Sequence, residues 1–91
     1  MRFSWDEQKR RTNIVRHGID FVDAAAVFET ETHTKLDNRF DYGEVRFLTI
    51  GMVNGRILAV SHSEEEGLIR IISVRKAEKH EQETYFKKIR N

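Results

Sequence analysis

The clearest hydrophobic pattern in the chain is a short helical stripe that begins at residue 21. Phe21, Ala24, Ala25 and Phe28 recur at the i, i+3, i+4 and i+7 positions of one helix face. Asp20 directly precedes the stripe and is a residue type that caps helix N-termini. The spacing therefore predicts a short amphipathic helix whose apolar side packs into the core, and it indicates no chemistry for these side chains.

A longer and more polar helix is predicted ahead of this one, from about Trp5 to His17. Ser4 and Glu7 fit a capping box, in which Ser4 accepts from the Glu7 amide and the Glu7 carboxylate reaches back. Gly18 suits the left-handed conformation that ends many helices. Apolar residues are scarce in this segment, so the helix is predicted to lie on the surface.

The rest of the chain predicts four β-strands and a last helix. Asn54-Gly55 stands between two apolar runs and is a strong signal for a two-residue type I′ hairpin turn. The fourth strand is almost continuously apolar and is therefore predicted to be central. The predicted elements are a strand or extended arm at 1–3, strands at 32–37, 45–53, 56–63 and 68–75, and a polar helix at about 76–89.

This order of elements predicts an α+β fold, with two N-terminal helices, an antiparallel four-stranded sheet and a C-terminal helix. The chain has 91 residues, which is room for a single domain over residues 1–91. It has no cysteine, and its four histidines show no metal-ligand spacing, so we expect no metal and no cofactor. No apolar run is long enough for a membrane span or a signal peptide, so a cytoplasmic protein is expected.

Charge is unevenly distributed along the chain. Residues 1–17 carry five Lys or Arg and two acids, residues 18–67 carry four and ten, and residues 68–91 carry seven and three. Basic ends that meet in space would form a positive patch that attracts polyanions. A solvated surface of mixed charge is the alternative.

The predicted hairpins place particular polar residues on each face of the sheet. The turn at 54–55 sets Arg46 opposite Ser63, and a pairing of Ser63 with Leu68 would set Arg70 opposite Ser61. This register puts Arg46, Ser61, Ser63 and Arg70 on one face, and His62, Ser73 and Arg75 on the other.

Arg46, Arg70 and Arg75 lie within otherwise apolar strands and therefore need partners. One interpretation is salt bridges, for example between Arg46 and Glu44 or an acid of the 64–66 turn. The other is a phosphate site, because guanidinium groups bind phosphoryl oxygens bidentately.

Two polar stripes at four-residue spacing also have two interpretations. On the first helix, Lys9, Asn13 and His17 form a stripe that is either solvent-exposed or functional. On the last helix, Glu81 and Tyr85 have structural interpretations, in which Glu81 bonds Arg75 or a lysine and the Tyr85 ring packs while its hydroxyl reaches a strand.

Several short motifs follow one another along nearly the whole chain. They are Phe3-Ser4-Trp5-Asp6-Glu7-x-Lys9, Asn13, Arg16-His17-Gly18-Ile19-x-Phe21, Phe28, Arg39-x-x-Tyr42-Gly43-Glu44-x-Arg46 and Ile69-Arg70-Ile71-Ile72-Ser73-Val74-Arg75-x-Ala77-x-x-x-Glu81-x-x-x-Tyr85. This series resembles the BrnT toxin family. Two departures are mild, since Arg16 stands where a lysine is more usual and Val74 where an alanine is more usual.

The resemblance implies a RelE-like fold and a ribonuclease toxin of a type II toxin–antitoxin system that arrests translation. It implies a cognate antitoxin, expected to be of the ribbon-helix-helix type, which neutralises the toxin. The complex would bind operator DNA only through this antitoxin. It further implies an RNA substrate cleaved without a metal, by attack of a ribose 2′-hydroxyl on the adjacent phosphate.

For that reaction we expect Arg46, Arg70 and Arg75 to supply the cations around the phosphate. His17 is the first candidate for the general acid or base, and Glu44 is the second candidate base. The expected substrate-binding residues are Lys9, on a neighbouring phosphate, and Tyr85, stacked on a base or donating to the phosphate. The alternative function is a non-catalytic binding module, or a co-repressor that acts only with a DNA-binding partner.

Overall fold

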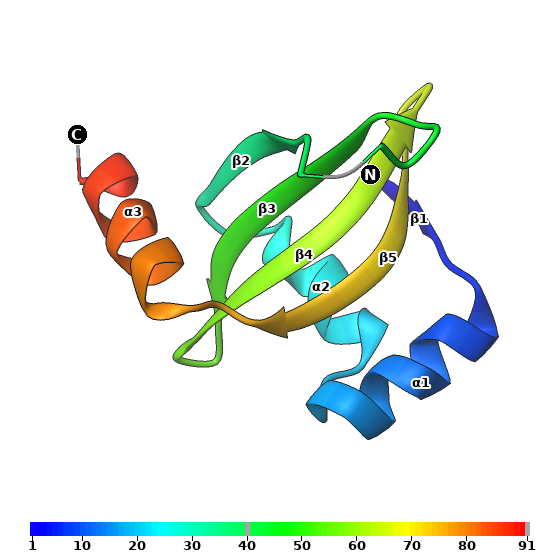
Figure 1. Cartoon of the computed structure of the whole chain (residues 1–91). Helices are drawn as coiled ribbons and strands as arrows, with labels where there is room; N and C mark the ends of the chain where they lie inside the picture. Colours follow the sequence, from blue (N-terminus) through cyan, green and yellow to red (C-terminus); the bar gives the residue numbers. More distant parts are fainter. Residues whose placement is uncertain (40, 91) are drawn as a thin grey trace.

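One mixed β-sheet with helices on both faces forms the fold (Figure 1). The computed structural model describes residues 1–39 and 41–90. In chain order the elements are β1 (Arg2–Ser4), α1 (Glu7–His17), α2 (Phe21–Val27), β2 (Thr32–Asp37), β3 (Arg46–Val53), β4 (Arg56–Glu65), β5 (Leu68–Lys76) and α3 (Lys79–Ile89).

The sheet has five strands in the order β1-β5-β4-β3-β2. The four predicted antiparallel strands are confirmed, but the segment predicted at 1–3 as a strand or extended arm adds β1, which pairs in parallel with β5 at one edge, so a sheet of only four antiparallel strands is wrong. The cause is tertiary packing: Phe3 contacts Phe28, with ring centroids 5.5 Å apart, and this seats β1 against a strand more than sixty residues away. Local sequence pattern carries no signal for such a pairing.

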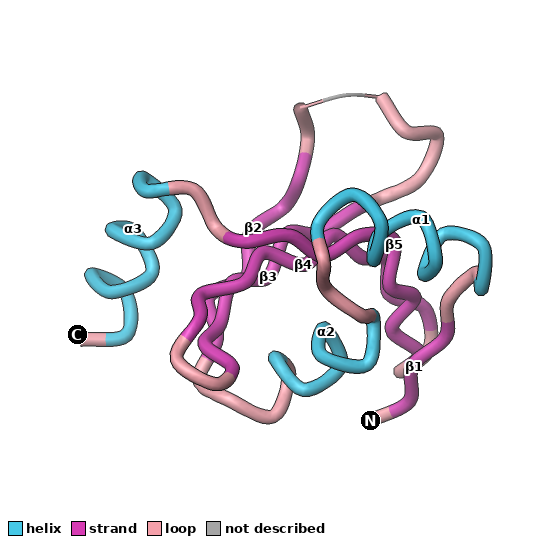
Figure 2. The backbone as a smooth tube through the Cα atoms, turned by 90° about the horizontal axis from the view of Figure 1, so that it is seen from below, coloured by secondary structure: helices cyan, strands magenta, loops and turns pink. Residues whose placement is uncertain are grey.

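Three helices are arranged around this sheet (Figure 2). α2 packs on one face, against β3, β4 and β5, while α1 lies along β5. α3 packs against β2 and β3 from the other face. On the same face α3 also covers Ile57 and Ala59 of β4, whereas Ser61 and Ser63 farther along β4 are partly exposed and Arg70 of β5 is exposed.

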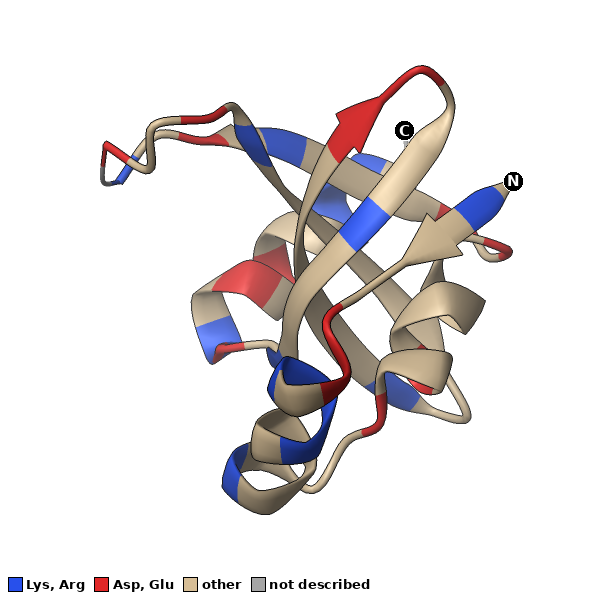
Figure 3. Ribbon diagram, turned by 90° about the vertical axis from the view of Figure 1, so that its right-hand side faces the viewer, with Lys and Arg blue, Asp and Glu red and all other residues tan. Residues whose placement is uncertain are grey.

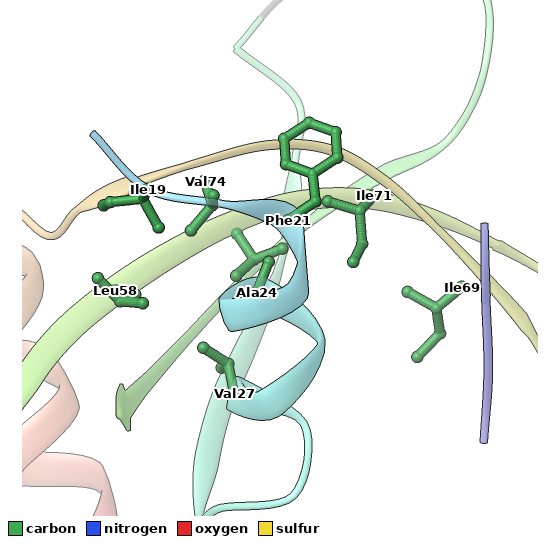
Figure 4. Close-up of a cluster of buried hydrophobic side chains, with 9 residues drawn as sticks. Ile19, Phe21, Ala24, Val27, Leu58, Ile69, Ile71 and Val74 are labelled. Atoms are coloured by element: carbon green, nitrogen blue, oxygen red, sulfur yellow. The ribbon is translucent and has the colours of Figure 1, made fainter. Parts of the chain in front are cut away.

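Each face of the sheet has its own core. On the α2 side, Phe21 and Ala24 of the predicted stripe are fully buried together with Val27 (Figure 4), while Ala25 and Phe28 of the stripe are partly buried against them. Burial of each large side chain contributes about 1.5–3 kcal/mol, which explains how a helix of only seven residues is held. The smaller α3-side core consists of Leu48, Ile50, Ile57, Ala59, Ala77 and Tyr85.

Two helix starts differ from those predicted. Ser4 belongs to β1, so Asp6 caps α1 instead, its Oδ1 accepting from the amides of Gln8 at 2.8 Å and Lys9 at 3.2 Å. At the other end of the chain, Lys76 still pairs with β4, so α3 begins at Lys79. The Gly18 cap is confirmed, with φ of 69°.

Both tight hairpin turns use left-handed residues. The predicted turn at Asn54-Gly55 is confirmed, with φ of 51° and 78°. A second turn forms at Glu66-Gly67, with φ of 50° and 79°, so that Glu65 pairs with Leu68. The predicted pairing of Ser63 with Leu68 is therefore wrong: Ser63 pairs with Arg70.

A β-bulge then changes which face the end of β5 presents. Ser61 pairs with Ser73 and His62 with Ile71, which leaves Ile72 as an extra residue. Beyond it Arg75 pairs with Ala59, which belongs to the α3-side core. The prediction that Ser73 and Arg75 face away from Arg70 is wrong, because the extra residue reverses the alternation of side chains.

Candidate functional site

The three arginines singled out in the sequence lie on the α3-side face of the sheet. Arg70 and Arg75 pair with Ser63 and Ala59, which alternate on one side of β4. Arg46 lies two residues before Leu48 on β3 and shares the face of that core residue. We call this surface, with Arg46, Arg70 and Arg75, the arginine face. Figure 3 shows Lys and Arg residues on β5 and also on the neighbouring β1 and α1.

Arg70 is exposed, and its side chain makes no hydrogen bond or ion pair with any residue within 1–39 and 41–90. Its partner across the parallel pair is Ser4 and across the antiparallel pair is Ser63, so no carboxylate stands opposite it on either side. The guanidinium group is therefore available to an external anion.

Arg46 has partners of its own. Its Nε donates to Oε1 of Glu44 at 3.3 Å, and its Cζ lies 4.0 Å from the centroid of the Tyr42 ring. This is the salt bridge that the sequence offers as an alternative for Arg46. The Glu44 carboxylate, 39% exposed, partly neutralises this end of the arginine face.

Arg75 is held by a buried carboxylate. Its Nη1 and Nη2 donate to Oε1 and Oε2 of Glu81 at 2.7 and 2.9 Å, and Glu81 is only 5% exposed. The hydrogen bonds to Glu81 raise the pKa of Arg75. Burial by itself would raise the pKa of Glu81, but the hydrogen bonds from Arg75 and from the Glu78 amide outweigh it and lower that pKa. The pair is fully ionised at neutral pH.

Lys9 and His17 lie on α1, which packs along the edge of β5 that faces away from β4. Together with Arg16 they line a cavity of about 210 Å³ that also touches Ile72 and Ser73, at the bulge. The structure thus brings these two candidates to the β5 strand that carries Arg70. Both side chains are exposed.

Asn13, between Lys9 and His17 on the same stripe, is a residue whose importance the sequence did not reveal. It is buried, and its Nδ2 donates to the carbonyls of Ile19 and Val74, both at 2.9 Å. Its Oδ1 accepts from the Val74 amide at 3.1 Å. In the sequence, Asn13 is only one of three polar residues at four-residue spacing, a pattern that fits solvent exposure equally well.

Tyr85 lies within the α3-side core and is 3% exposed. Its hydroxyl donates to the Glu31 carbonyl at 2.9 Å, directly before β2. These contacts match the structural interpretation of Tyr85, in which the ring packs and the hydroxyl bonds to the backbone next to a strand.

The described residues form neither a metal site nor a membrane-spanning helix. No group of three or more His, Cys, Asp or Glu within 1–39 and 41–90 is arranged to hold a metal ion. None of the helices described combines the length and the hydrophobicity that crossing a bilayer requires.

Fold and site together define a small α+β protein with cationic side chains on an uncovered part of its sheet. Comparison with known families identifies it further. Residues 5–81 match the model of the family described as "Ribonuclease toxin, BrnT, of type II toxin-antitoxin system", and the chain belongs to this family. No curated protein sequence matches the chain.

Proposed function

We propose that this chain is an endoribonuclease that cleaves RNA on its arginine face without a metal ion. The observation that carries the proposal is Arg70, an exposed guanidinium group without an acidic partner among the described residues, on the same face as Arg46 and Arg75. A free guanidinium group binds two phosphoryl oxygens bidentately. Membership of a ribonuclease toxin family supports RNA as the source of that phosphate.

In the proposed reaction the ribose 2′-oxygen attacks the adjacent phosphorus, and the bond from phosphorus to the 5′-oxygen breaks. A base takes the 2′-hydroxyl proton and an acid protonates the leaving 5′-oxygen, which leaves a cyclic phosphate and a 5′-hydroxyl. Negative charge on the phosphate grows in the transition state, where fixed cations stabilise it. Arg70 supplies the strongest such contact, because carboxylates already partly neutralise Arg46 and Arg75.

His17 and Glu44 are the proposed acid and base. His17 borders a cavity at β5, and Glu44 lies two residues before β3, with β4 between these two strands. We propose that His17 acts from the β5 side and Glu44 from the β3 side, because an in-line displacement places attacking and leaving oxygens on opposite sides of phosphorus. Lys9, in the His17 cavity, is proposed to bind a neighbouring phosphate.

The family implies an antitoxin partner. We propose that it is of the ribbon-helix-helix type, that it neutralises the toxin by covering the basic surface with an acidic segment, and that only the complex binds operator DNA. A RelE-like fold and action on translation in the cytoplasm complete the proposal.

The test is RNA cleavage by the purified chain in EDTA. Wild type is expected to cleave, Arg70→Ala to lose at least 100-fold in rate, and Arg56→Ala, which removes a charge at the far hairpin turn, to match wild type. Cleavage only with added Mg²⁺, or full activity of Arg70→Ala, would contradict the mechanism.

One observation favours the alternative of a non-catalytic binding module: Arg46 and Arg75 each already have a carboxylate partner. Folded protein that cleaves no RNA, yet binds its cognate antitoxin in a salt-sensitive manner, would support this alternative.

A further inference from the structure

A second polar cavity lies beside the arginine face, where the chain passes from β5 into α3. It has a volume of about 260 Å³ and is bounded by the end of β2, Leu48 of β3, Arg75 of β5 and the first turn of α3. Leu48 and Arg75 pair with Ser61 and Ala59, two residues apart on the same side of β4. The cavity therefore lies on the same face of the sheet as the three arginines, and Arg75 belongs to both.

The charged residues around this cavity balance one another. A phosphate group would meet as many carboxylates as cations there, whereas a neutral ligand with donor and acceptor groups meets partners for both. The charged lining residues are the cations Lys35, Arg39 and Arg75 and the carboxylates Asp37, Glu78 and Glu81, and the imidazole of His80 also lines the cavity.

Two guanidinium groups in the cavity wall are held in fixed planes. Arg39 donates through Nε and Nη2 to Asp37 at 2.9 and 3.0 Å, in the same bidentate manner in which Arg75 binds Glu81. Both carboxylates are buried, at 7% and 5% exposure, so each pair is anchored from the protein side. A guanidinium group fixed in this way offers a flat surface on which an aromatic heterocycle stacks.

Arg39 and Arg75 both line this cavity, and a guanidinium group attracts the face of an electron-rich aromatic ring. Leu48 adds an apolar side chain to the lining, and Asn38 adds both a donor and an acceptor.

We propose that this cavity binds one unpaired base of the RNA, next to the scissile phosphate, with the base stacked on the Arg39 guanidinium group. The inference rests on the proposed function, because it takes its ligand from the RNA bound at Arg70. It adds a base-recognition site that is separate from the phosphate contacts, with Arg39 as a specificity-determining residue.

The experiment uses an RNA tetranucleotide spanning a sequence that wild type cleaves, with 2′-fluoro sugars so that no attacking hydroxyl is present. Each base in turn is replaced by an abasic sugar, and affinities are measured. Wild type is expected to lose about tenfold at one position and little at the others. Arg39→Lys keeps the charge and loses the planar group, so its affinity is expected to be about tenfold lower for the intact tetranucleotide and insensitive to the abasic position. Arg56→Lys makes the same change at the far turn and is expected to match wild type.

A loss below twofold at every abasic position, or an abasic penalty that is the same in Arg39→Lys and wild type, would overturn the inference. A measurement on wild type alone covers the case in which Arg39→Lys does not fold: amide chemical shifts of Asn38 and Glu78 must differ between the intact and the abasic complex, and identical shifts overturn it. Failure of the proposed function looks different, because wild type would then cleave no RNA at all.

Discussion

Asn13 makes two hydrogen bonds to the backbone of Val74, donating to its carbonyl at 2.9 Å and accepting from its amide at 3.1 Å. An adjacent β-strand would make the same two contacts. β1 pairs with β5 only up to Arg70, so the side chain of a helix residue takes over the edge of β5 where the neighbouring strand has ended. This contact fixes α1, and with it Lys9 and His17, against β5.

Asn13→Ala is therefore expected to destabilise the protein by about 2–4 kcal/mol, because it leaves a buried amide and carbonyl of Val74 without partners. Urea unfolding measures the change. Thr12→Ala, at an exposed position of the same helix, is the control and is expected to stay within about 0.5 kcal/mol of wild type. Equal stability of the two variants would show that water replaces the Asn13 amide.

Alanine variants of Arg75 and Arg70 are expected to differ in stability although both lose activity. Arg75→Ala leaves the buried Glu81 carboxylate unpaired and is expected to lower the free energy of unfolding by about 1–3 kcal/mol, a range reduced because Arg75 is 24% exposed. Arg70→Ala breaks no internal contact and should change stability by less than about 0.5 kcal/mol. Both are expected to lose RNA cleavage, and the double variant Arg75→Ala/Glu81→Ala should recover part of the lost stability.

His62 is expected to make stability fall as the solution is acidified below about pH 6.5. It is fully buried between Phe28 and Phe47, and burial lowers its pKa, so it stays neutral in the fold while the unfolded chain takes up a proton. Thr49 Oγ1 lies 2.6 Å from its Nε2, and Glu64, 3.6 Å from its Nδ1, offsets part of the effect. The stability it confers is present above pH 6.5 and is lost as pH falls toward the lower folded pKa.

His62→Phe is the variant that checks this, since it retains a ring between the two phenylalanines and removes the titration. Urea unfolding between pH 4.5 and 7 should show a flatter pH dependence than in wild type. His33→Asn is a necessary comparison, because burial, Lys88 and Lys35 also lower the pKa of His33. An unchanged slope in His62→Phe would assign the effect to other groups.

The stability that the Arg10–Asp20 ion pair contributes is expected to be lost at a lower pH than the stability that His62 contributes. The Arg10 guanidinium group, at 2.8 and 2.9 Å, and the Val22 amide lower the pKa of Asp20 to about 2. Its contribution to stability is therefore complete above the unfolded pKa of about 4 and is lost as pH falls toward 2. Asp20→Asn should be less stable than wild type at pH 7, and the difference should shrink by pH 2. A constant difference would point to the α2 cap alone.

Local patterns were sufficient for several elements. The stripe of Phe21, Ala24, Ala25 and Phe28 predicted α2, because these four residues recur on one helix face, and all four pack in the α2-side core. Asn54-Gly55 defined the β3–β4 register, because a two-residue turn with left-handed residues leaves one pairing possible. The motifs that resemble the BrnT family led to the family that the comparison then identified.

Local patterns were not sufficient to place the candidate site residues on the sheet. Strand alternation counted along the sequence put Arg75 on the wrong face, because the count contains no sign of the extra residue at Ile72. The Glu66-Gly67 turn shifted Arg70 from Ser61 to Ser63, since glutamate gives no local indication of a left-handed conformation.

The amino-acid sequence by itself determined the kinds of element, their order and the family, since these follow from periodicities of two and 3.6 residues and from motifs read along the chain. Only the tertiary structure decided which arginines share a face of the sheet, which of them a carboxylate neutralises, and that Asn13 completes the edge of β5. Those outcomes depend on contacts between residues far apart in the chain, where one extra residue in a strand reverses the direction of every side chain after it.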